Sequence, residues 1–105
     1  MKKASGFTDR VYAVAAKIPK GKVLTYGRLA ALAGRPGAAR AVGSAMRKNP
    51  SRNAVPCHRV VASDGDLTGY AFGSGIATKK NLLKKEGVAF RGERVDLAVS
   101  NWDGA

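Results

Sequence analysis

Cysteine and histidine are nearly missing from this chain of 105 residues, which contains one of each. A single cysteine cannot close a disulfide within the chain, and one cysteine with one histidine offers too few ligands for a zinc cage. The two kinds of crosslink that usually stabilise a small domain, the disulfide and the structural metal ion, are therefore excluded. The fold must be held together by its hydrophobic core.

Long apolar runs are also missing. No stretch approaches the ~18–20 residues that cross a bilayer, and the Lys2-Lys3 start is not followed by the hydrophobic core of a signal peptide. We therefore expect a soluble, cytoplasmic protein with no membrane partner. The length and the share of hydrophobic residues, 45%, are those of one globular domain, which we expect to span residues 1–105 with no N-terminal accessory domain.

Acidic residues are scarce and unevenly placed. The chain has 19 Lys and Arg against 7 Asp and Glu, a net charge of +12. Residues 1–63 hold 13 basic side chains and only Asp9 as an acid, whereas residues 64–105 hold six of each sign. All the net charge lies in the first three-fifths, so we expect a polyanion such as DNA to bind there. The alternative is a solvated basic face without a partner.

The first half of the chain has the periodicity of three helices. Apolar residues at spacings of three and four predict a helix over residues 7–18, which a proline and a glycine end. A second helix is expected over residues 25–33, with Thr25 as its N-cap, and a third over residues 38–48. The loop over residues 34–37 that separates them is rich in residues that break helices.

The third helix has mostly small side chains, and Arg40 and Arg47 project from one face two turns apart. Two short helices joined by a tight turn, the second small and basic, are typical of a helix-turn-helix whose second helix enters a DNA groove. The alternative is a helical hairpin in which small residues only allow close helix packing.

The second half should contribute a small β element and one more helix. Residues 54–62 are rich in β-branched side chains, so we expect them to be extended, as a short hairpin or wing that ends at residues 63–66. Residues 69–75 form a glycine-rich loop without the spacing of a phosphate-binding loop. The predicted fold class is mainly α with a small β element, a winged helix-turn-helix domain.

A further helix is expected over residues 76–85, and a tail that docks over the core follows it. Four lysines of this helix are expected to point largely outward, namely Lys79, Lys80, Lys84 and Lys85. The expected anchors of the tail are Val95, Leu97, Val99 and Trp102.

The only cysteine and the only histidine are consecutive, Cys57 and His58. A lone cysteine is more often a small buried hydrophobe than a nucleophile, but the basic neighbourhood of Arg59 favours the reactive thiolate. Consecutive residues of a strand point to opposite faces, so His58 would need a bend at Pro56 or a bridging water to serve Cys57. Glu86 is a candidate to orient the imidazole.

These residues carry a resemblance to a known family. In order and spacing the chain resembles the catalytic domain of the 6-O-alkylguanine-DNA alkyltransferases from about Phe7 to Phe90. In that family a winged helix-turn-helix binds the minor groove, flips the damaged guanine out of the duplex and transfers its alkyl group to cysteine. The matching segments are Tyr26-Gly27, Ala39-Arg40-Ala41-Val42-Gly43, Asn49-Pro50, Pro56-Cys57-His58-Arg59-Val60, Gly69-Tyr70, Leu82-Leu83 and Glu86-Gly87.

The resemblance implies a role for each matching residue. Cys57 would accept the alkyl group, His58 would act as base through a water, Glu86 would hold His58, and Asn49 would brace the turn before the cysteine. Arg40 would fill the space left by the flipped base. The implied DNA contacts are Tyr26, Ala38, Ala39, Arg40, Gly43, Arg47, Arg59 and Ser63. The implied lesion pocket consists of Tyr26, Met46, Val60, Phe72, Gly73, Ser74 and Lys79.

The implied reaction is an irreversible single transfer by a monomer on double-stranded DNA that contains 6-O-alkylguanine, without a metal or other cofactor. The protein would be associated with the nucleoid when it is on DNA. Flipping costs a few kcal/mol of stacking, which an inserted side chain can offset.

The tail points to a second possibility. Its run from Gly92 to Trp102, with the short length of the chain, resembles the alkyltransferase-like proteins, which bind alkylated guanine, replace the cysteine and hand the lesion to excision repair. The retained Cys57 favours the alkyltransferase, and a sensor of alkylated DNA that recruits excision-repair proteins is the main alternative. A plain helix-turn-helix regulator and a cysteine hydrolase are weaker alternatives.

Overall fold

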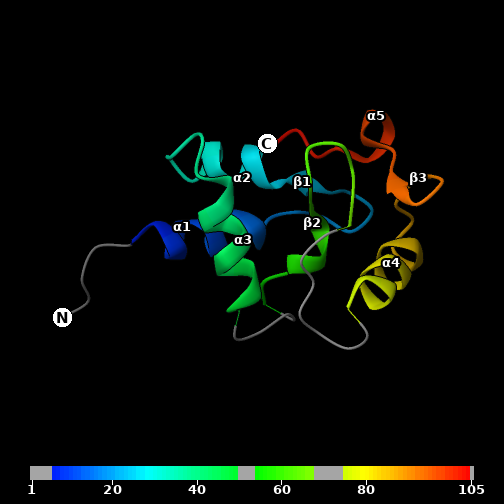
Figure 1. Cartoon of the computed structure of the whole chain (residues 1–105), viewed down its shortest axis with the longest axis horizontal. Helices are drawn as coiled ribbons and strands as arrows, with labels where there is room; N and C mark the ends of the chain where they lie inside the picture. Colours follow the sequence, from blue (N-terminus) through cyan, green and yellow to red (C-terminus); the bar gives the residue numbers. More distant parts are fainter. Residues whose placement is uncertain (1–5, 50–53, 68–74, 105) are drawn as a thin grey trace.

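The computed structural model describes residues 6–49, 54–67 and 75–104. The first three helices lie together at one end of the molecule, and two short paired strands separate them from the fourth helix at the other end (Figure 1). The first part of the tail lies beside the fourth helix, and the C-terminus returns to the second helix. The elements in chain order are α1 Phe7–Ala15, β1 Leu24–Thr25, α2 Tyr26–Leu32, α3 Ala39–Arg47, the 3-10 turn η1 Cys57–Arg59, β2 Val60–Val61, α4 Ile76–Lys85, β3 Phe90–Arg91, β4 Arg94–Val95 and α5 Leu97–Ser100.

The three predicted helices of the first half are present, and α2 packs against α3 as a helix-turn-helix requires. Thr25 caps α2 as predicted, because its hydroxyl oxygen accepts a hydrogen bond from the Arg28 amide at 3.2 Å. The first helix is shorter than predicted and ends at Ala15. The amides of Lys17 and Ile18 donate to the carbonyl oxygens three residues back, those of Val14 and Ala15, as in a 3-10 helix.

Two hydrophobic clusters hold these parts together. The larger cluster fills the space among α1, α2 and α3 and also takes in Cys57 and Trp102. The smaller one joins the paired strands to α4 and the tail, and its buried members are Val23, Val61, Leu67, Leu83, Val88 and Val95. The turn that carries Cys57 therefore rests on the core of the helix-turn-helix.

The prediction of an extended hairpin over residues 54–62 is wrong. Residues Cys57–Arg59 form the 3-10 turn η1, and only Val60–Val61 is a strand. That strand pairs with β1 in parallel, with Leu24 opposite Val60. Pro56 explains the difference, because it cannot donate to a sheet ladder and its fixed φ, −77°, starts a turn. The antiparallel hairpin of the described residues is β3 with β4.

The last predicted helix has the expected bounds, Ile76–Lys85, but Lys79 does not point outward. Its side chain is 1% exposed. The packing of α4 against η1 brings this position into the interior. The glycine-rich loop over residues 69–75 lies, apart from Gly75, outside the described residues.

The tail docks over the core as predicted. Its backbone runs beside Val23, whose amide donates to Ser100 O at 2.8 Å and whose carbonyl oxygen accepts from the Trp102 amide at 2.7 Å. Val95 and Trp102 are buried anchors and Leu97 is partly buried, but Val99 is 59% exposed and the prediction for it is wrong. No helix within the described ranges is long and apolar enough to cross a bilayer.

Candidate active site

Cys57 is the first residue of η1, and its side chain is buried with 4% exposure. A tight turn centred on Pro56 precedes it, in which the Cys57 amide donates to Val55 O at 2.8 Å. Successive side chains of a 3-10 turn are about 120° apart, whereas those of a strand alternate between faces. The bend required at Pro56 is therefore present, and His58 follows Cys57 on a turn.

Asn49 connects the end of the helix-turn-helix to this turn. Its Nδ2 donates to Val55 O at 2.8 Å, and its side chain is 5% exposed. Its backbone amide donates to Met46 O, so the residue is fixed at the end of α3. This contact is the one that a residue bracing the turn would make. Its effect on a reaction at Cys57 stays a prediction.

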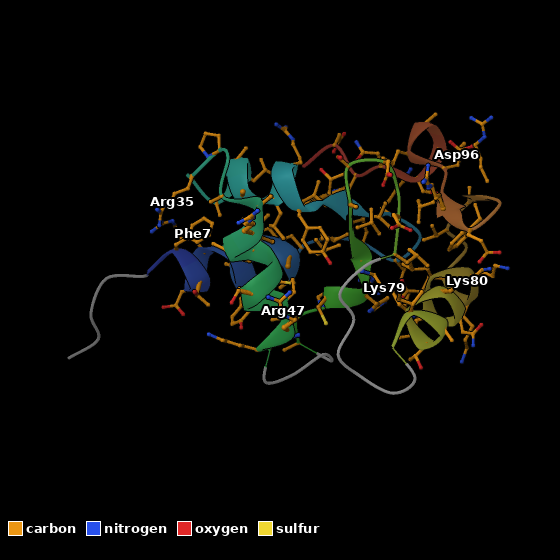
Figure 2. The ribbon with its side chains drawn as sticks, viewed as in Figure 1. Phe7, Arg35, Arg47, Lys79, Lys80 and Asp96 are labelled. Atoms are coloured by element: carbon orange, nitrogen blue, oxygen red, sulfur yellow. The ribbon has the colours of Figure 1, made fainter. Side chains whose placement is uncertain are left out.

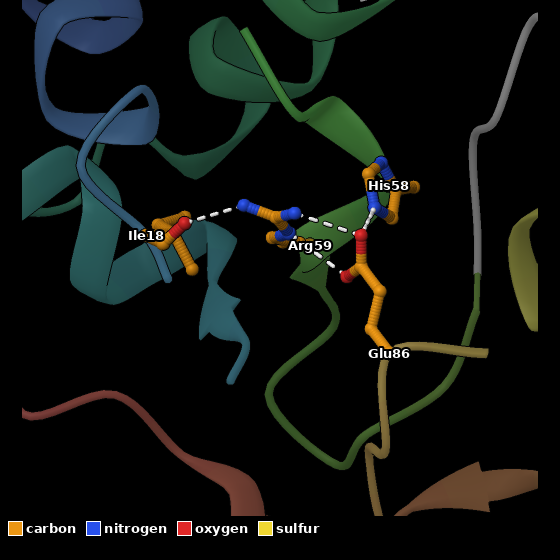
Figure 3. A network of polar contacts seen from close by, with 4 residues as sticks. All are labelled: Ile18, His58, Arg59 and Glu86. Carbon is orange, nitrogen blue, oxygen red and sulfur yellow. Dashed lines mark hydrogen bonds and ion pairs between the residues drawn. The ribbon is translucent and has the colours of Figure 1, made fainter. Parts of the chain in front are cut away.

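His58 lies against Glu86, with Nε2 and Oε2 3.0 Å apart (Figure 3). Burial lowers the pKa of His58 below its ordinary value, although Glu86 opposes this effect. The imidazole is therefore predominantly neutral at pH 7. A neutral imidazole that donates from Nε2 to a carboxylate keeps Nδ1 as its acceptor, and we assign this tautomer from the contact with Glu86.

Glu86 is held by Arg59 as well as by His58. Arg59 Nε donates to Oε1 at 2.9 Å and Nη2 donates to Oε2 at 2.7 Å. Burial alone would raise the pKa of Glu86, but the hydrogen bonds from Arg59 and His58 outweigh it and hold the pKa below its ordinary value. Glu86 is therefore an ionised carboxylate that fixes the orientation of His58.

Arg59 was expected to contact DNA, and that contact stays a prediction; in the structure its guanidinium makes hydrogen bonds within the protein. Its third interaction is from Nη1 to Ile18 O at 2.7 Å, and its side chain is 13% exposed. The guanidinium therefore links Ile18, three residues after the end of α1, to Glu86 (Figure 3). The sequence alone does not distinguish an arginine that holds a carboxylate inside the protein from one that contacts a DNA phosphate, because both roles require only a cation at that position.

Replacing Arg59 by methionine should lower the free energy of unfolding by about 2–3 kcal/mol, because Glu86 would stay buried with His58 as its only partner in this network. Urea unfolding at pH 7 measures the change. Arg91→Met is the matched control, since Arg91 is exposed on β3. A cost below ~0.5 kcal/mol, the usual range of surface substitutions, would contradict the bridging role of Arg59.

Of the predicted lesion pocket, Tyr26, Met46, Val60 and Lys79 are described. Met46 and Val60 are buried in the same cluster as Cys57, and Tyr26 packs against that cluster. Lys79 Nζ lies 5.7 Å from the centroid of the Tyr26 ring. Three of these side chains thus belong to, or pack against, the cluster that contains the cysteine, and their part in a lesion pocket stays a prediction. The other predicted pocket residues, Phe72, Gly73 and Ser74, lie outside the described residues.

The remaining predicted DNA contacts lie on or beside α3. Arg40 and Arg47 are exposed, whereas Val42, Ala45 and Met46 on the opposite face are buried. The small residues Ala38, Ala39 and Gly43 are half-buried, and Ser63 is exposed in the turn after β2. Figure 2 shows Arg47 on α3. The side of α3 that faces solvent is therefore basic, and several of its side chains are small. The contact of these residues with DNA stays a prediction.

Sequence reasoning missed two neighbours of this site. Tyr12 of α1 donates from its hydroxyl to Ala45 O at 2.7 Å, and burial, followed by the charge of Cys57, raises its pKa. Asp66 interacts electrostatically with Lys79. The sequence contains a weak signal for Tyr12, because a tyrosine at the edge of an apolar helix face usually buries its ring and finds a hydrogen-bond partner for its hydroxyl. No signal in the sequence indicates the interaction of Asp66 with Lys79.

Within the described residues, no three side chains of histidine, cysteine, aspartate or glutamate are grouped so that they could hold a metal ion. A shallow cavity of about 380 Å³ lies at the far end of the molecule and contains no predicted site residue. Its lining residues are Asp64, Arg91, Arg94, Val95, Asp96, Leu97 and Ala98.

Comparison with known sequences shows similarity to methylated-DNA–protein-cysteine methyltransferases. The model of the DNA-binding domain of 6-O-methylguanine DNA methyltransferase matches residues 6–88. The methylated-DNA–protein-cysteine methyltransferase of Salmonella typhimurium is 52% identical over 81 residues, which are 77% of this chain and 46% of that protein. The mouse protein of the same name is 52% identical over 83 residues, 78% of this chain and 39% of its own length. The chain thus spans less than half the length of these curated relatives.

Comparison with solved structures adds a relative of similar length. S. pombe Atl1, an alkyltransferase-like protein solved in complex with damaged DNA containing O6-carboxymethylguanine, superposes with a TM-score of 0.78 at 34% identity. The match covers 92% of this chain and 94% of Atl1. The O6-methylguanine methyltransferase of Mycobacterium tuberculosis gives a TM-score of 0.71 at 46% identity, over 81% of this chain and 50% of that one.

The sequence match over residues 6–88 and the fold agree with each other and with the resemblance seen in the motifs. We conclude that the chain belongs to the 6-O-methylguanine DNA methyltransferase family, of which it carries the helix-turn-helix DNA-binding domain.

Proposed function

We propose that the protein repairs 6-O-alkylguanine in DNA by transferring the alkyl group once and irreversibly to Sγ of Cys57. The observation that carries the proposal is the turn η1, in which the only cysteine precedes a neutral histidine that is hydrogen-bonded to an ionised glutamate. A thiol next to an oriented base is the arrangement that nucleophilic catalysis by cysteine requires.

The chemistry follows from the assigned tautomer. Nδ1 of His58 accepts the thiol proton of Cys57 through a water, and the carboxylate of Glu86 stabilises the imidazolium that forms. The thiolate attacks the alkyl carbon in line, the S–C bond forms and the C–O bond to guanine breaks. Guanine leaves with the bonding electron pair and takes up a proton. The product is a thioether, so each chain acts once.

DNA recognition is assigned to the basic first half of the chain. The exposed face of α3 would enter the minor groove, with Arg40 occupying the space of the flipped base and Arg47 and Ser63 contacting phosphates. Half-buried Ala39 and Gly43 leave room for the duplex to approach the helix. In this proposal residues 1–105 act as one domain, and a single copy is sufficient.

Intact-protein mass spectrometry tests the proposal. The chain is mixed with an excess of duplex DNA that contains one 6-O-methylguanine, and the modified peptide is then mapped. We expect each chain to gain one methyl group in place of a hydrogen, only at Cys57, and the reaction to saturate at one per chain. An unchanged mass with tight binding to the lesion would overturn the proposal.

A second candidate function is supported by the likeness to Atl1, which extends over nearly the whole of both chains. The tail after residue 88, which the methyltransferase family model does not match, takes part in that likeness. Under this alternative the protein senses alkylated guanine, Cys57 is unreactive, and excision-repair proteins are recruited. The unchanged mass described above is its expected result.

A further inference from the structure

Lys79 is the one lysine buried among the described residues, with 1% of its side chain exposed. Lys84 and Lys85 on the same helix are exposed, and Lys80 is half-buried and paired with Glu93 at 2.5 Å. Figure 2 shows Lys79 between α4 and the rest of the molecule. Burying a lysine is costly because the ammonium loses its hydration, so an interior lysine needs a compensating interaction.

The groups around Lys79 come from three other parts of the fold. The ring of Tyr26, the first residue of α2, faces the ammonium with its centroid 5.7 Å from Nζ. Helix α4 packs against η1, whose first residue is Cys57, so Lys79 and Cys57 are buried at the same contact. Ionised Cys57 and Asp66, which follows β2, attract the ammonium, and the charge of Lys79 disfavours protonated His58. The carboxylate of Asp66, the ring of Tyr26, the imidazole of His58 and the proposed nucleophile Cys57 therefore all interact with the charge of Lys79.

These surroundings determine the protonation of Lys79. Burial lowers its pKa from 10.5 to about 8, while the charges of Cys57 and Asp66 act in the opposite direction. The side chain is therefore mostly a cation at pH 7 and loses its charge as the pH rises through about 8. As a cation it has three donors and no acceptor, so it cannot take the thiol proton.

We propose that the buried ammonium of Lys79 is the electrostatic partner of the Cys57 thiolate, a positioning residue that keeps the nucleophile in its reactive form. His58 removes the proton and Lys79 stabilises the charge that remains on sulfur. A neighbouring opposite charge favours the ionised form, and the effect is larger in a site from which water is excluded. Its relevance to repair rests on the proposed function, but the state of the thiol can be measured without DNA.

The test is a pH titration of the thiolate by its ultraviolet absorbance, in which the absorbance of the matching Cys57→Ser protein is subtracted. The variants are Lys79→Met and, as control, Lys85→Met, which removes an exposed lysine from the same helix. We expect the fraction of thiolate at pH 7 to fall about tenfold or more in Lys79→Met and to stay unchanged in Lys85→Met. Lys79→Arg, which retains the charge, should restore part of it.

Identical titration curves for the wild type and Lys79→Met, or an equal shift in Lys85→Met, would overturn the proposal. Methionine has no charge to desolvate, so Lys79→Met is expected to fold, and the fluorescence of the only tryptophan, Trp102, checks this. If it does not fold, Lys79→Gln replaces it in the same titration. A shifted thiolate titration without methyl transfer from DNA would refute the proposed function alone, and the reverse pattern would refute only the role of Lys79.

Discussion

Replacing Cys57 by alanine should abolish methyl transfer to the protein and leave binding to DNA containing 6-O-methylguanine largely intact. In the proposed reaction Sγ is the acceptor, so its removal leaves no group to form the thioether. The side chains expected to hold the DNA, such as Arg40 and Arg47, project from the exposed face of α3 and do not depend on the sulfur. Intact mass and competition between methylated and unmodified duplexes measure the two effects.

The variant is expected to fold. Cys57 is buried in the larger cluster, and alanine in its place leaves only a small cavity that costs on the order of 1 kcal/mol. Arg40→Ala is the complementary control for DNA binding, because it removes an exposed side chain of α3 that is proposed to contact DNA and keeps the cysteine that is proposed to accept the methyl group. A methyl group on the Cys57→Ala protein would reveal another acceptor. Loss of lesion preference in that protein would mean that Cys57 serves binding rather than transfer.

The helices near the site could be predicted because local signals determine them. Thr25 caps α2 through a hydrogen bond to a residue three positions ahead, and the apolar spacing of α4 gives its bounds correctly. The pairing of His58 with Glu86 was predicted from a chemical requirement, since an imidazole that acts as a base needs an orienting acceptor. With two glutamates in the chain, few candidates were available.

The parts that could not be predicted depend on contacts distant in sequence. The β-branched residues around Cys57 indicate an extended segment, yet Pro56 begins a turn and the strand that follows pairs with β1, far back in the chain. Lys79 has the local pattern of an exposed lysine. Its burial arises only when α4 packs against η1, which brings it to Tyr26 and Cys57.

Replacing Gly65 by alanine should lower the free energy of unfolding by about 3 kcal/mol or more. Gly65 has φ +87°, a left-handed backbone that costs an alanine roughly 1–2 kcal/mol. A Cβ there would also overlap the carbonyl oxygen of Val95 and lie 3.2 Å from its amide nitrogen. These atoms belong to the backbone of β4 and cannot rotate away. The hydrogen bond from the Val95 amide to Gly65 O, 3.0 Å long, would have to stretch or break.

Gly37→Ala is the matched control for this prediction. Gly37, in the loop between α2 and α3, has φ +91°, but a Cβ on it would meet no atom within 4 Å. Both variants therefore carry the same backbone strain, and the difference between their urea unfolding free energies measures the collision with Val95. Equal costs would contradict the close approach of the two segments.

The Gly65→Ala protein should also transfer a methyl group to Cys57 more slowly, because the turn at Gly65 directly follows η1 and β2 in the chain. Gly37→Ala leaves that turn untouched and should not slow the transfer.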